Sequence, residues 1–247
     1  MLYEILRRTG TYRIIQRANE LRYLKRRIEF YKTFLAQGQL AFDIGANMGN
    51  RTNVFARLGC KVVAVEPQKN VFEYLQRRFR DKPQIICLNE AVGEKAGWAE
   101  IITSEADGLS TVSREWIDRV KKSGRFTEIQ WKGRERVRLT TLDKLIQAYG
   151  EPSFCKIDVE GYELHVLRGL SQPVKALSFE FNTPESNETT VTAITYLNTL
   201  GKYEFNLSFG ESMRLEYKSW LSSSEFVSEF RKIKTMTFGD IYARLLR

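Results

Sequence analysis

The chain has 247 residues, of which 43% are hydrophobic and 28% are charged, which suits one large globular domain better than two small ones. No apolar run approaches the roughly 20 residues that span a bilayer. Charges interrupt every short apolar stretch at the N-terminus, so no secretory signal peptide is predicted either. The net charge is +9, but nine basic residues and three acids within Met1–Leu35 give that segment +6 by itself. The remainder is only mildly basic, which argues against a nucleic-acid-binding surface spread over it.

The first predicted element is an N-terminal amphipathic helix, in which apolar residues recur at three- and four-residue steps. These residues are Leu21, Leu24, Ile28, Tyr31 and Leu35. We assign residues 1–37 to this basic helical extension and residues 38–247 to one α/β domain. The apolar stripe can dock on the domain, which we favour, or the helix can lie on an anionic membrane surface. We expect a cytoplasmic protein, peripheral at the inner membrane face if the second interpretation holds.

From residue 38 onward, short apolar runs alternate with helical patterns. The predicted strands are 40–44, 61–66, 84–88, 98–103, 136–140, 154–159 and 176–181, with candidate edge strands at 203–208 and 236–243. The predicted helices are 52–58, 71–79, 111–122, 141–149, 162–170 and 189–200. Strands that alternate with helices predict a doubly wound, mostly parallel sheet.

The most informative motif is Phe42-Asp43-Ile44-Gly45-Ala46-Asn47-Met48-Gly49, which lies where the first strand ends and a helix begins. Without Cβ atoms, Gly45 and Gly49 allow a tight bend and a close approach to a ligand. The amides at the following helix N-terminus can hold an anionic group, such as the carboxylate of an amino acid. The spacing is DxGxxxG, which differs from the GxGxxG that binds a dinucleotide pyrophosphate.

Glu66 stands at the tip of the next strand, and Pro67 closes that strand. A carboxylate at this position can accept hydrogen bonds from both hydroxyls of a ribose. The two glycines could instead form only a tight turn, with Glu66 capping a strand. Because both features end adjacent predicted strands, we predict a pocket for a nucleoside joined to an amino acid.

A second motif, Lys156-Ile157-Asp158-Val159-Glu160-Gly161-Tyr162-Glu163, ends the 154–159 strand. Strand alternation puts Lys156, Asp158 and Glu160 on one side, at the sheet edge where open α/β sheets bind ligands. Three acids within six residues repel one another, so we expect them to serve a substrate, a cation or a structural network.

Three separated blocks of the sequence, in the same order, resemble the FkbM family of S-adenosylmethionine-dependent methyltransferases. They are FDIGANMGNRTNVFARLGCKVVAVEPQ, TTLDKLI and KIDVEGYELHVLRGL. The resemblance runs from about Phe34 to Phe181 and is looser beyond. It implies a class I methyltransferase fold, Rossmann-like, with a mostly parallel seven-stranded sheet. It also implies S-adenosyl-L-methionine as cofactor and O-methylation of sugars, glycans or hydroxyl-bearing natural products.

The same resemblance assigns roles to individual residues. For cofactor binding it implies Asp43, Gly45, Asn47, Gly49, Glu66, Pro67, Asn89, Ala91 and Asp158. The residues placed near the transferred methyl are Asp158, Glu160, Gly161 and Glu163.

A sugar hydroxyl is a poor nucleophile and benefits from a general base. Asp158 is the preferred base or orienting residue, and Glu160 and Glu180 are the substitutes. The one histidine, His165, lies inside a predicted helix and is interpreted as a solvated helix residue. Glu163 could equally cap free amides at the start of that helix.

Whether a metal takes part stays open at this point. Asp158, Glu180 and Asn182 lie at the ends of neighbouring predicted strands and offer oxygen ligands that suit Mg²⁺. Acids at strand ends also occur without a metal, so the sequence alone does not decide between the two.

The function that these features predict is O-methylation of a saccharide or glycoconjugate hydroxyl, with a small molecule or glycan as acceptor and no nucleic-acid partner. The alternatives are methylation of a polyketide, peptide or lipid hydroxyl, and a noncatalytic module that binds S-adenosylmethionine or a glycan.

Overall fold

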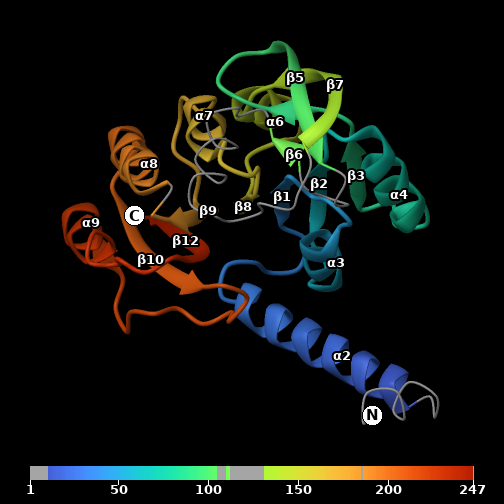
Figure 1. The fold of residues 1–247 in the computed structure, drawn as a ribbon, viewed down its shortest axis with the longest axis horizontal. Helices are drawn as coiled ribbons and strands as arrows, with labels where there is room; N and C mark the ends of the chain where they lie inside the picture. Colours follow the sequence, from blue (N-terminus) through green and yellow to red (C-terminus); the bar gives the residue numbers. More distant parts are fainter. Residues whose placement is uncertain (1–10, 105–109, 112–130, 185, 247) are drawn as a thin grey trace.

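The computed structural model describes residues 11–104, 110–111, 131–184 and 186–246. An eight-stranded sheet forms its centre, with the strand order β11-β10-β12-β9-β8-β1-β2-β3 (Figure 1). The strands are β1 (Leu40–Ile44), β2 (Lys61–Val65), β3 (Ile85–Leu88), β8 (Phe154–Ile157), β9 (Ala176–Thr183), β10 (Tyr203–Phe209), β11 (Leu221–Ser222) and β12 (Thr237–Leu245). The α/β class that the sequence predicts is therefore confirmed.

The prediction of a mostly parallel, seven-stranded sheet is confirmed in part, because the sheet is mixed and has eight strands. Strands β3, β2, β1, β8 and β9 are parallel, but β12 runs antiparallel to both β9 and β10, and β11 adds an eighth strand. The segment predicted as the edge strand 236–243 lies instead between β9 and β10. Its residues Ile241, Tyr242 and Ala243 are fully buried, because helices or loops cover both faces of the sheet here.

A second sheet, of four strands, has the order β4-β7-β5-β6. Its strands are β4 (Ala91–Val92), β5 (Gly97–Ser104), β6 (Ser110–Thr111) and β7 (Trp131–Thr140). It contains both strands predicted between residues 98 and 140, which therefore add nothing to the main sheet. Of the predicted helix 111–122, Thr111 belongs to β6, and the rest lies outside the described residues.

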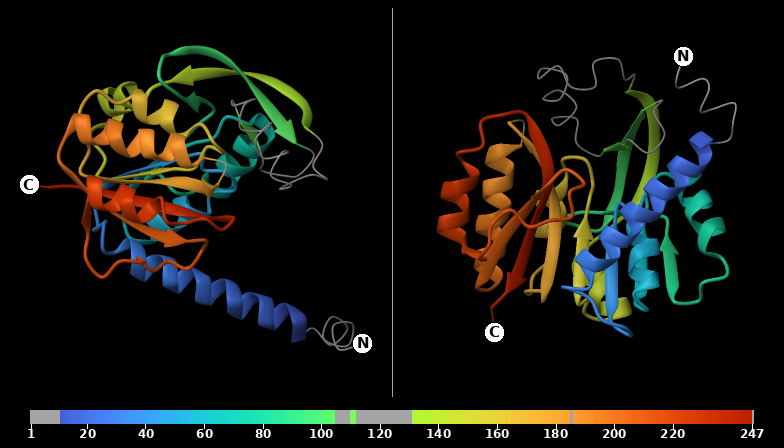
Figure 2. Two further views of the ribbon diagram at one scale, coloured as in Figure 1. Left: turned by 60° about the vertical axis from the view of Figure 1, so that its left-hand side comes forward. Right: turned by 90° about the horizontal axis from the view of Figure 1, so that it is seen from below.

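Helices cover both faces of the main sheet (Figure 2). On one face, α3 (Asn50–Arg57) and α4 (Lys69–Phe79) pack beside the end of α2. The other face carries α6 (Leu142–Tyr149), α7 (Glu163–Arg168), α8 (Asn187–Leu200) and α9 (Ser223–Phe230). Helix α9 was not predicted, although Ser222 and Glu225 form a capping box at its start.

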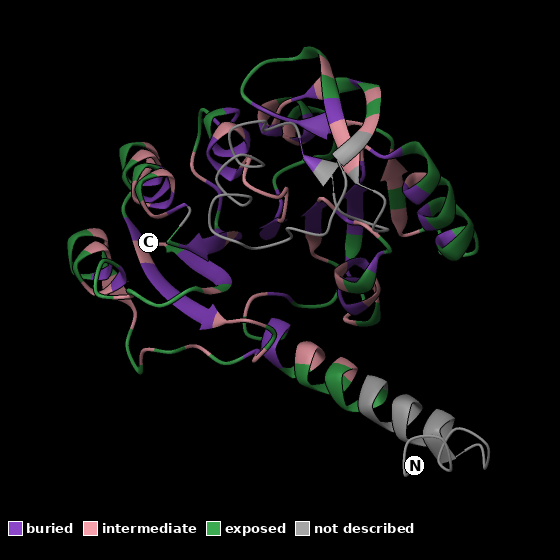
Figure 3. Cartoon of the chain, viewed as in Figure 1, coloured by how far each residue is buried: buried purple, intermediate pink, exposed green. Residues whose placement is uncertain are grey.

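Helix α2 (Thr11–Tyr31) packs against the domain through Leu24, Ile28, Phe30 and Tyr31. Phe30 and Tyr31 are buried there, whereas Leu21 is 53% exposed and the helix projects away from the domain (Figures 1 and 3). Docking of the apolar stripe, the favoured interpretation, thus holds for the last turns. None of the helices within the described ranges is long and apolar enough to cross a membrane.

Candidate functional site

The loop after β1 touches the loop after β8 at Gly45. The Gly45 amide donates to the Val65 carbonyl over 2.9 Å, and the Asp158 amide donates to the Ile44 carbonyl over 2.9 Å. A Cβ atom on residue 45 would lie 1.8 Å from the carbonyl oxygen of Asp158, and the φ angle of Gly45 is +79°. Only glycine tolerates both conditions, so Gly45 sets the close approach of the two loops.

Glu66 follows β2 and is held by backbone amides alone. Its Oε2 accepts from the Asn47 amide and its Oε1 from the Gln68 amide, each over 2.9 Å. Burial raises the pKa of Glu66 to about 7, against the lowering effect of the two amides. The carboxylate is thus fixed in orientation, and each oxygen retains a lone pair for a further donor.

Glu66 faces a pocket that is partly open to solvent. Six residues predicted to bind the cofactor line it: Gly45, Asn47, Glu66, Pro67, Ala91 and Asp158. Glu160, one of the predicted substitute bases, lines it as well. The structure therefore brings the two sequence motifs together around one cavity.

The other three residues predicted to bind cofactor lie behind the pocket walls. Asp43 is 1% exposed and accepts from the Thr52 hydroxyl over 2.5 Å, an interaction that fixes the first turn of α3. Gly49 precedes α3 with a φ of +79°, and a Cβ atom there would strike the side chains of Phe79 and Leu75. Asn89 donates to the carbonyls of Glu66 and Pro67 over 3.0 and 2.8 Å. These three residues shape the loops that form the pocket.

The pocket is also lined by Val92, Ile101, Thr111 and Tyr162, of which Ile101, Thr111 and Tyr162 were not predicted from the sequence. Val92, Ile101 and Thr111 belong to the four-stranded sheet, whose place beside the pocket depends on pairings distant in the chain. Tyr162 directly follows the Asp158–Gly161 turn, so its position in the motif was an available signal. With Val65, the two aliphatic side chains and the Tyr162 ring give the pocket an apolar wall.

One oxygen each from Asp158, Glu160 and Glu180 lies within 4.8 Å of the others. We call these three residues the acidic cluster. Glu180 comes from β9, and among the described residues its buried Oε2 has no hydrogen-bond partner. Burial and the charges of Glu160 and Asp158 raise the pKa of Glu180 well above its ordinary value. Both effects favour the neutral form of this carboxyl group over the ionised form.

Glu163 stabilises the turn that presents the acidic cluster. Its Oε1 accepts from the amides of Gly161 and Val159 over 3.0 and 3.3 Å, and burial raises its pKa to about 7. This arrangement favours the interpretation of Glu163 as a capping residue. His165 stacks on the Tyr162 ring with 4.3 Å between centroids, but its side chain is 43% exposed and does not line the pocket.

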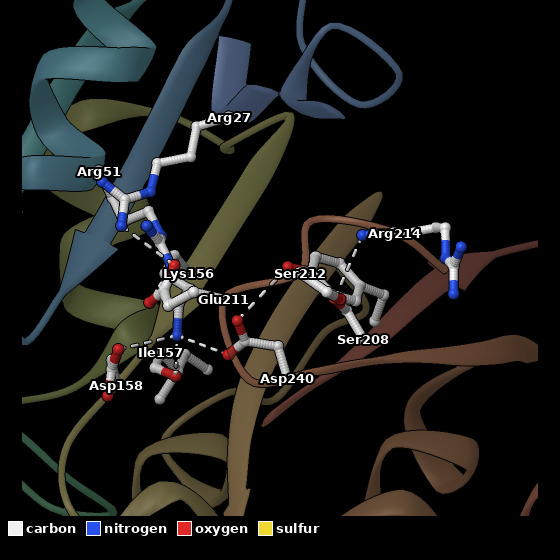
Figure 4. A network of polar contacts seen from close by, with 11 residues as sticks. Arg27, Arg51, Lys156, Ile157, Asp158, Ser208, Glu211, Ser212, Arg214 and Asp240 are labelled. Carbon is white, nitrogen blue, oxygen red and sulfur yellow. Dashed lines mark hydrogen bonds and ion pairs between the residues drawn. The ribbon is translucent and has the colours of Figure 1, made fainter. Parts of the chain in front are cut away.

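Behind the acidic cluster lies Lys156, whose side chain is 1% exposed. Its Nζ donates to Oδ2 of Asp158 over 3.1 Å and to Oδ1 of Asp240 over 2.8 Å (Figure 4). Strand alternation predicted Lys156 and Asp158 on one side, whereas the contact with Asp240 on β12 was not foreseen.

The pocket thus combines two chemical capacities. The fixed Glu66 carboxylate can accept hydrogen bonds from a diol beside an apolar wall that suits a flat ring. Asp158 lines the same cavity with a side chain that is 40% exposed, so its carboxylate can accept a proton from a group bound there.

Comparison with known proteins agrees with these capacities. A family model described as "Methyltransferase FkbM domain" matches residues 43–231. No curated protein matches the chain.

Many solved structures are similar to this chain at low identity. A precorrin-6y C5,15-methyltransferase from Geobacter metallireducens is 12% identical, with 89% of this chain and 87% of that chain covered and a TM-score of 0.45. An rRNA methylase from Streptococcus thermophilus is 13% identical, with 89% and 94% covered and a TM-score of 0.43. Fibrillarin from Aeropyrum pernix, with natively bound S-adenosyl-L-methionine, is 12% identical, with 84% and 67% covered and a TM-score of 0.41.

Proposed function

The chain belongs to the FkbM methyltransferase family and is an S-adenosylmethionine-dependent methyltransferase, and on this premise we propose that it methylates a hydroxyl of a sugar, glycan or glycoconjugate. The observation that carries the proposal is that Asp158 lines the same pocket as Glu66. A proton acceptor thereby adjoins the cavity that suits the cofactor. Residues 38–247 form the methyltransferase domain in this proposal, and residues 1–37 form an extension to it.

The residues around the pocket fit S-adenosylmethionine. The orientation of the Glu66 carboxylate, set by two amides, suits the two ribose hydroxyls. The apolar side chains of Val92 and Ile101 suit the adenine.

The bound cofactor supplies a methyl group that is already activated as a sulfonium. The protein therefore has to orient the acceptor hydroxyl, take its proton and exclude water. Lys156 holds Oδ2 of Asp158, and in the described part of the chain Oδ1 accepts no hydrogen bond. Oδ1 is thus the atom that would accept the proton as the hydroxyl oxygen forms its new bond to carbon.

The charge of the acidic cluster favours a donor-rich acceptor. Carboxyl oxygens accept hydrogen bonds from neighbouring hydroxyls of a polyol, whereas they repel phosphate and other anions. This supports a saccharide and disfavours a nucleic acid. A polyketide, peptide or lipid hydroxyl is the alternative acceptor, and a noncatalytic binding module is the alternative function.

The test is to incubate the protein and methyl-labelled S-adenosylmethionine with fractionated glycans and lipids from the source cell. We expect label in the glycan fraction, in a form that resists alkali as a methyl ether does and a methyl ester does not. Label in a lipid or peptide fraction would support the alternative acceptors. If no fraction is labelled while S-adenosylhomocysteine still binds, the noncatalytic function is the better explanation.

A further inference from the structure

Phe238, near the start of β12, is exposed although its side chain is a hydrocarbon. Among the phenylalanines that the structure describes, it alone is exposed, at 48% of its surface. A phenylalanine ring has no polar group for water to solvate, so a buried position is its usual environment. Single exposed apolar residues also occur on ordinary surfaces, and the meaning of this one therefore depends on its neighbours.

The register of the main sheet places Phe238 beside the acidic cluster. Asp240 lies directly opposite Glu180, which belongs to the cluster. Two residues earlier on β12, Phe238 lies directly opposite Asn182. Residues opposite each other in antiparallel strands share one face, and diagonal neighbours on that face lie roughly 7–8 Å apart. Phe238 and Glu180 are such diagonal neighbours, so the ring lies on the same face of the sheet as the cluster.

Gly210, directly after β10, borders the ring of Phe238. Its amide donates to the Phe238 carbonyl over 2.8 Å, and its φ angle is +49°, which favours glycine. A Cβ atom on residue 210 would lie 3.6 Å from the ring, in van der Waals contact with it. A longer side chain there would lie against the ring, so glycine keeps this part of the ring open.

An exposed aromatic ring beside carboxyl groups suits a sugar. A pyranose carries hydroxyls around its rim and C–H groups on its faces. Carboxyl oxygens accept hydrogen bonds from the hydroxyls, and the negative face of an aromatic ring attracts the C–H groups. A lipid chain would need the aromatic ring but not the acids, and a phosphate would be repelled by the acids.

The distance between ring and base indicates the size of the acceptor. Asp158 follows β8, and β12 lies two strands away, on the far side of β9. Neighbouring strands are about 4.8 Å apart, so the two positions are separated by roughly 10 Å. That separation is longer than a single pyranose ring, and two linked sugars can span it.

We propose that Phe238 is a binding platform for the acceptor, on which the sugar next to the methylated sugar stacks while a hydroxyl of the methylated sugar reaches Asp158. The inference rests on the proposed function and adds that the acceptor is an oligosaccharide. Phe238 contacts the acceptor away from the reacting atoms, so it determines which acceptors bind and not the rate of methyl transfer.

The test uses the full chain with the variants F238A, F238L and F238W. F238L keeps an apolar side chain without an aromatic face, and F238W restores a larger aromatic face. The control is W98A, because Trp98 is also an exposed aromatic residue, at 63%, but lies on the opposite face of β5 from the pocket residue Ile101. The glycan fraction is separated by size into monosaccharides and oligosaccharides, and labelled methyl transfer to each gives KM and kcat.

For the oligosaccharides we expect KM to rise about tenfold in F238A and F238L, because one aromatic contact is lost. The kcat should stay within about twofold of wild type, since the contact binds ground state and transition state alike. F238W should restore the wild-type KM, and W98A should match the wild type. Monosaccharides should be poor acceptors for the wild type and for F238A alike, and calorimetry should show the same affinity for S-adenosylhomocysteine in all variants.

A folded F238A protein with the wild-type KM for oligosaccharides would overturn the inference. A wild-type KM in F238L would overturn stacking on an aromatic face, and monosaccharides that the wild type methylates as well as oligosaccharides would overturn the second sugar. A fall in kcat alone would also contradict the inference, because Phe238 would then support the site and not bind the acceptor. Failure of the proposed function has a different signature, since the wild type would then label no glycan of any size.

Discussion

The two sides of the pocket hold their carboxylates in different ways. Glu66 is fixed by the amides of Asn47 and Gln68, which are dipoles of the backbone and cannot move away. The acidic cluster depends on one side chain, Lys156, and on partners from β8, β9 and β12. A group that must bind the same ligand in every cycle suits the first arrangement. A group that must gain and lose a proton suits the second, because neighbouring charges tune protonation.

The largest effect should follow from a substitution of Asp158 in the acidic cluster. D158N keeps the shape but cannot accept a proton, so labelled methyl transfer to the glycan fraction should fall on the order of 10³-fold. Affinity for S-adenosylmethionine, measured by calorimetry, should change far less than that. If weaker cofactor binding explained the whole loss of rate, Asp158 would act in cofactor binding, as Glu66 does, and not as a proton acceptor.

On the cofactor side, E66A should weaken S-adenosylmethionine binding about 100-fold, because two hydrogen bonds to a charged acceptor are lost. Calorimetry measures the dissociation constant directly. E73Q removes an exposed carboxylate on α4 and serves as the control, with affinity expected to stay at the wild-type value. If E66A bound the cofactor normally, our assignment of the pocket would be wrong.

Gly45 lies where the two sides meet, and G45A tests how tightly they are joined. The added Cβ would lie 1.8 Å from the Asp158 carbonyl oxygen, so we expect a loss of about 3 kcal/mol or more in the free energy of unfolding. The matched control is G38A, with a similar φ of +82° and nothing within 4 Å. It should lose only about 1 kcal/mol to backbone strain. Equal losses in urea denaturation would mean that the contact is unimportant.

The pH dependence of binding should report Glu66. Its pKa is raised to about 7 by burial, and the ionised form accepts the ribose hydroxyls. Affinity for S-adenosylmethionine should therefore fall as the pH drops below 7, by about tenfold per unit. The neutral variant E66Q should bind weakly and lack this slope between pH 5.5 and 8.

The stability of the cofactor-free protein should fall as the pH rises, which is the opposite of the trend in cofactor affinity. The pKa values of Glu66 and Glu163 are raised from 4.5 to about 7 in the fold, so the folded chain binds more protons than the unfolded chain between those values. Their contribution to stability is present at low pH and is lost as the pH rises through 7. Comparing the melting profiles of wild type and E66Q against pH isolates the contribution of Glu66.

The smallest effect should come from removing divalent cations. Lys156 already offsets part of the charge of the acidic cluster, so labelled methyl transfer should be unchanged in EDTA. Activity that EDTA abolished and Mg²⁺ restored would show instead that a metal completes the cluster, as oxygen ligands at strand ends allow.

The sequence was sufficient to place residues at the ends of buried strands. Gly45, Glu66 and Asp158 follow β1, β2 and β8, whose apolar runs are unambiguous, and parallel strands end at one edge of the sheet. It did not reveal that Asp43 turns away from the pocket to Thr52, because a carboxylate before a turn can face either the ligand or the next helix.

The sequence did not predict the residues that strand pairings between distant parts of the chain bring to the pocket. Thr111 and Ile101 reach the pocket through the four-stranded sheet, whose register joins β5 to β7 across a long gap. Asp240 meets Lys156 although 84 residues separate them, since β12 inserts between β9 and β10. No local pattern specifies that insertion. The sequence pattern of residues 236–243 does not distinguish an edge strand from an internal strand.

The insertion of β12 also orders events during synthesis of the protein. On the ribosome, β9 and β10 emerge well before Thr237–Leu245 and cannot form their final hydrogen bonds until that segment arrives. Throughout this interval Lys156 lacks Asp240, and two neighbouring strands present open edges to other nascent chains. We therefore expect the nascent protein to need shielding by chaperones until β12 has emerged, and the contact between Lys156 and Asp240 to form only then.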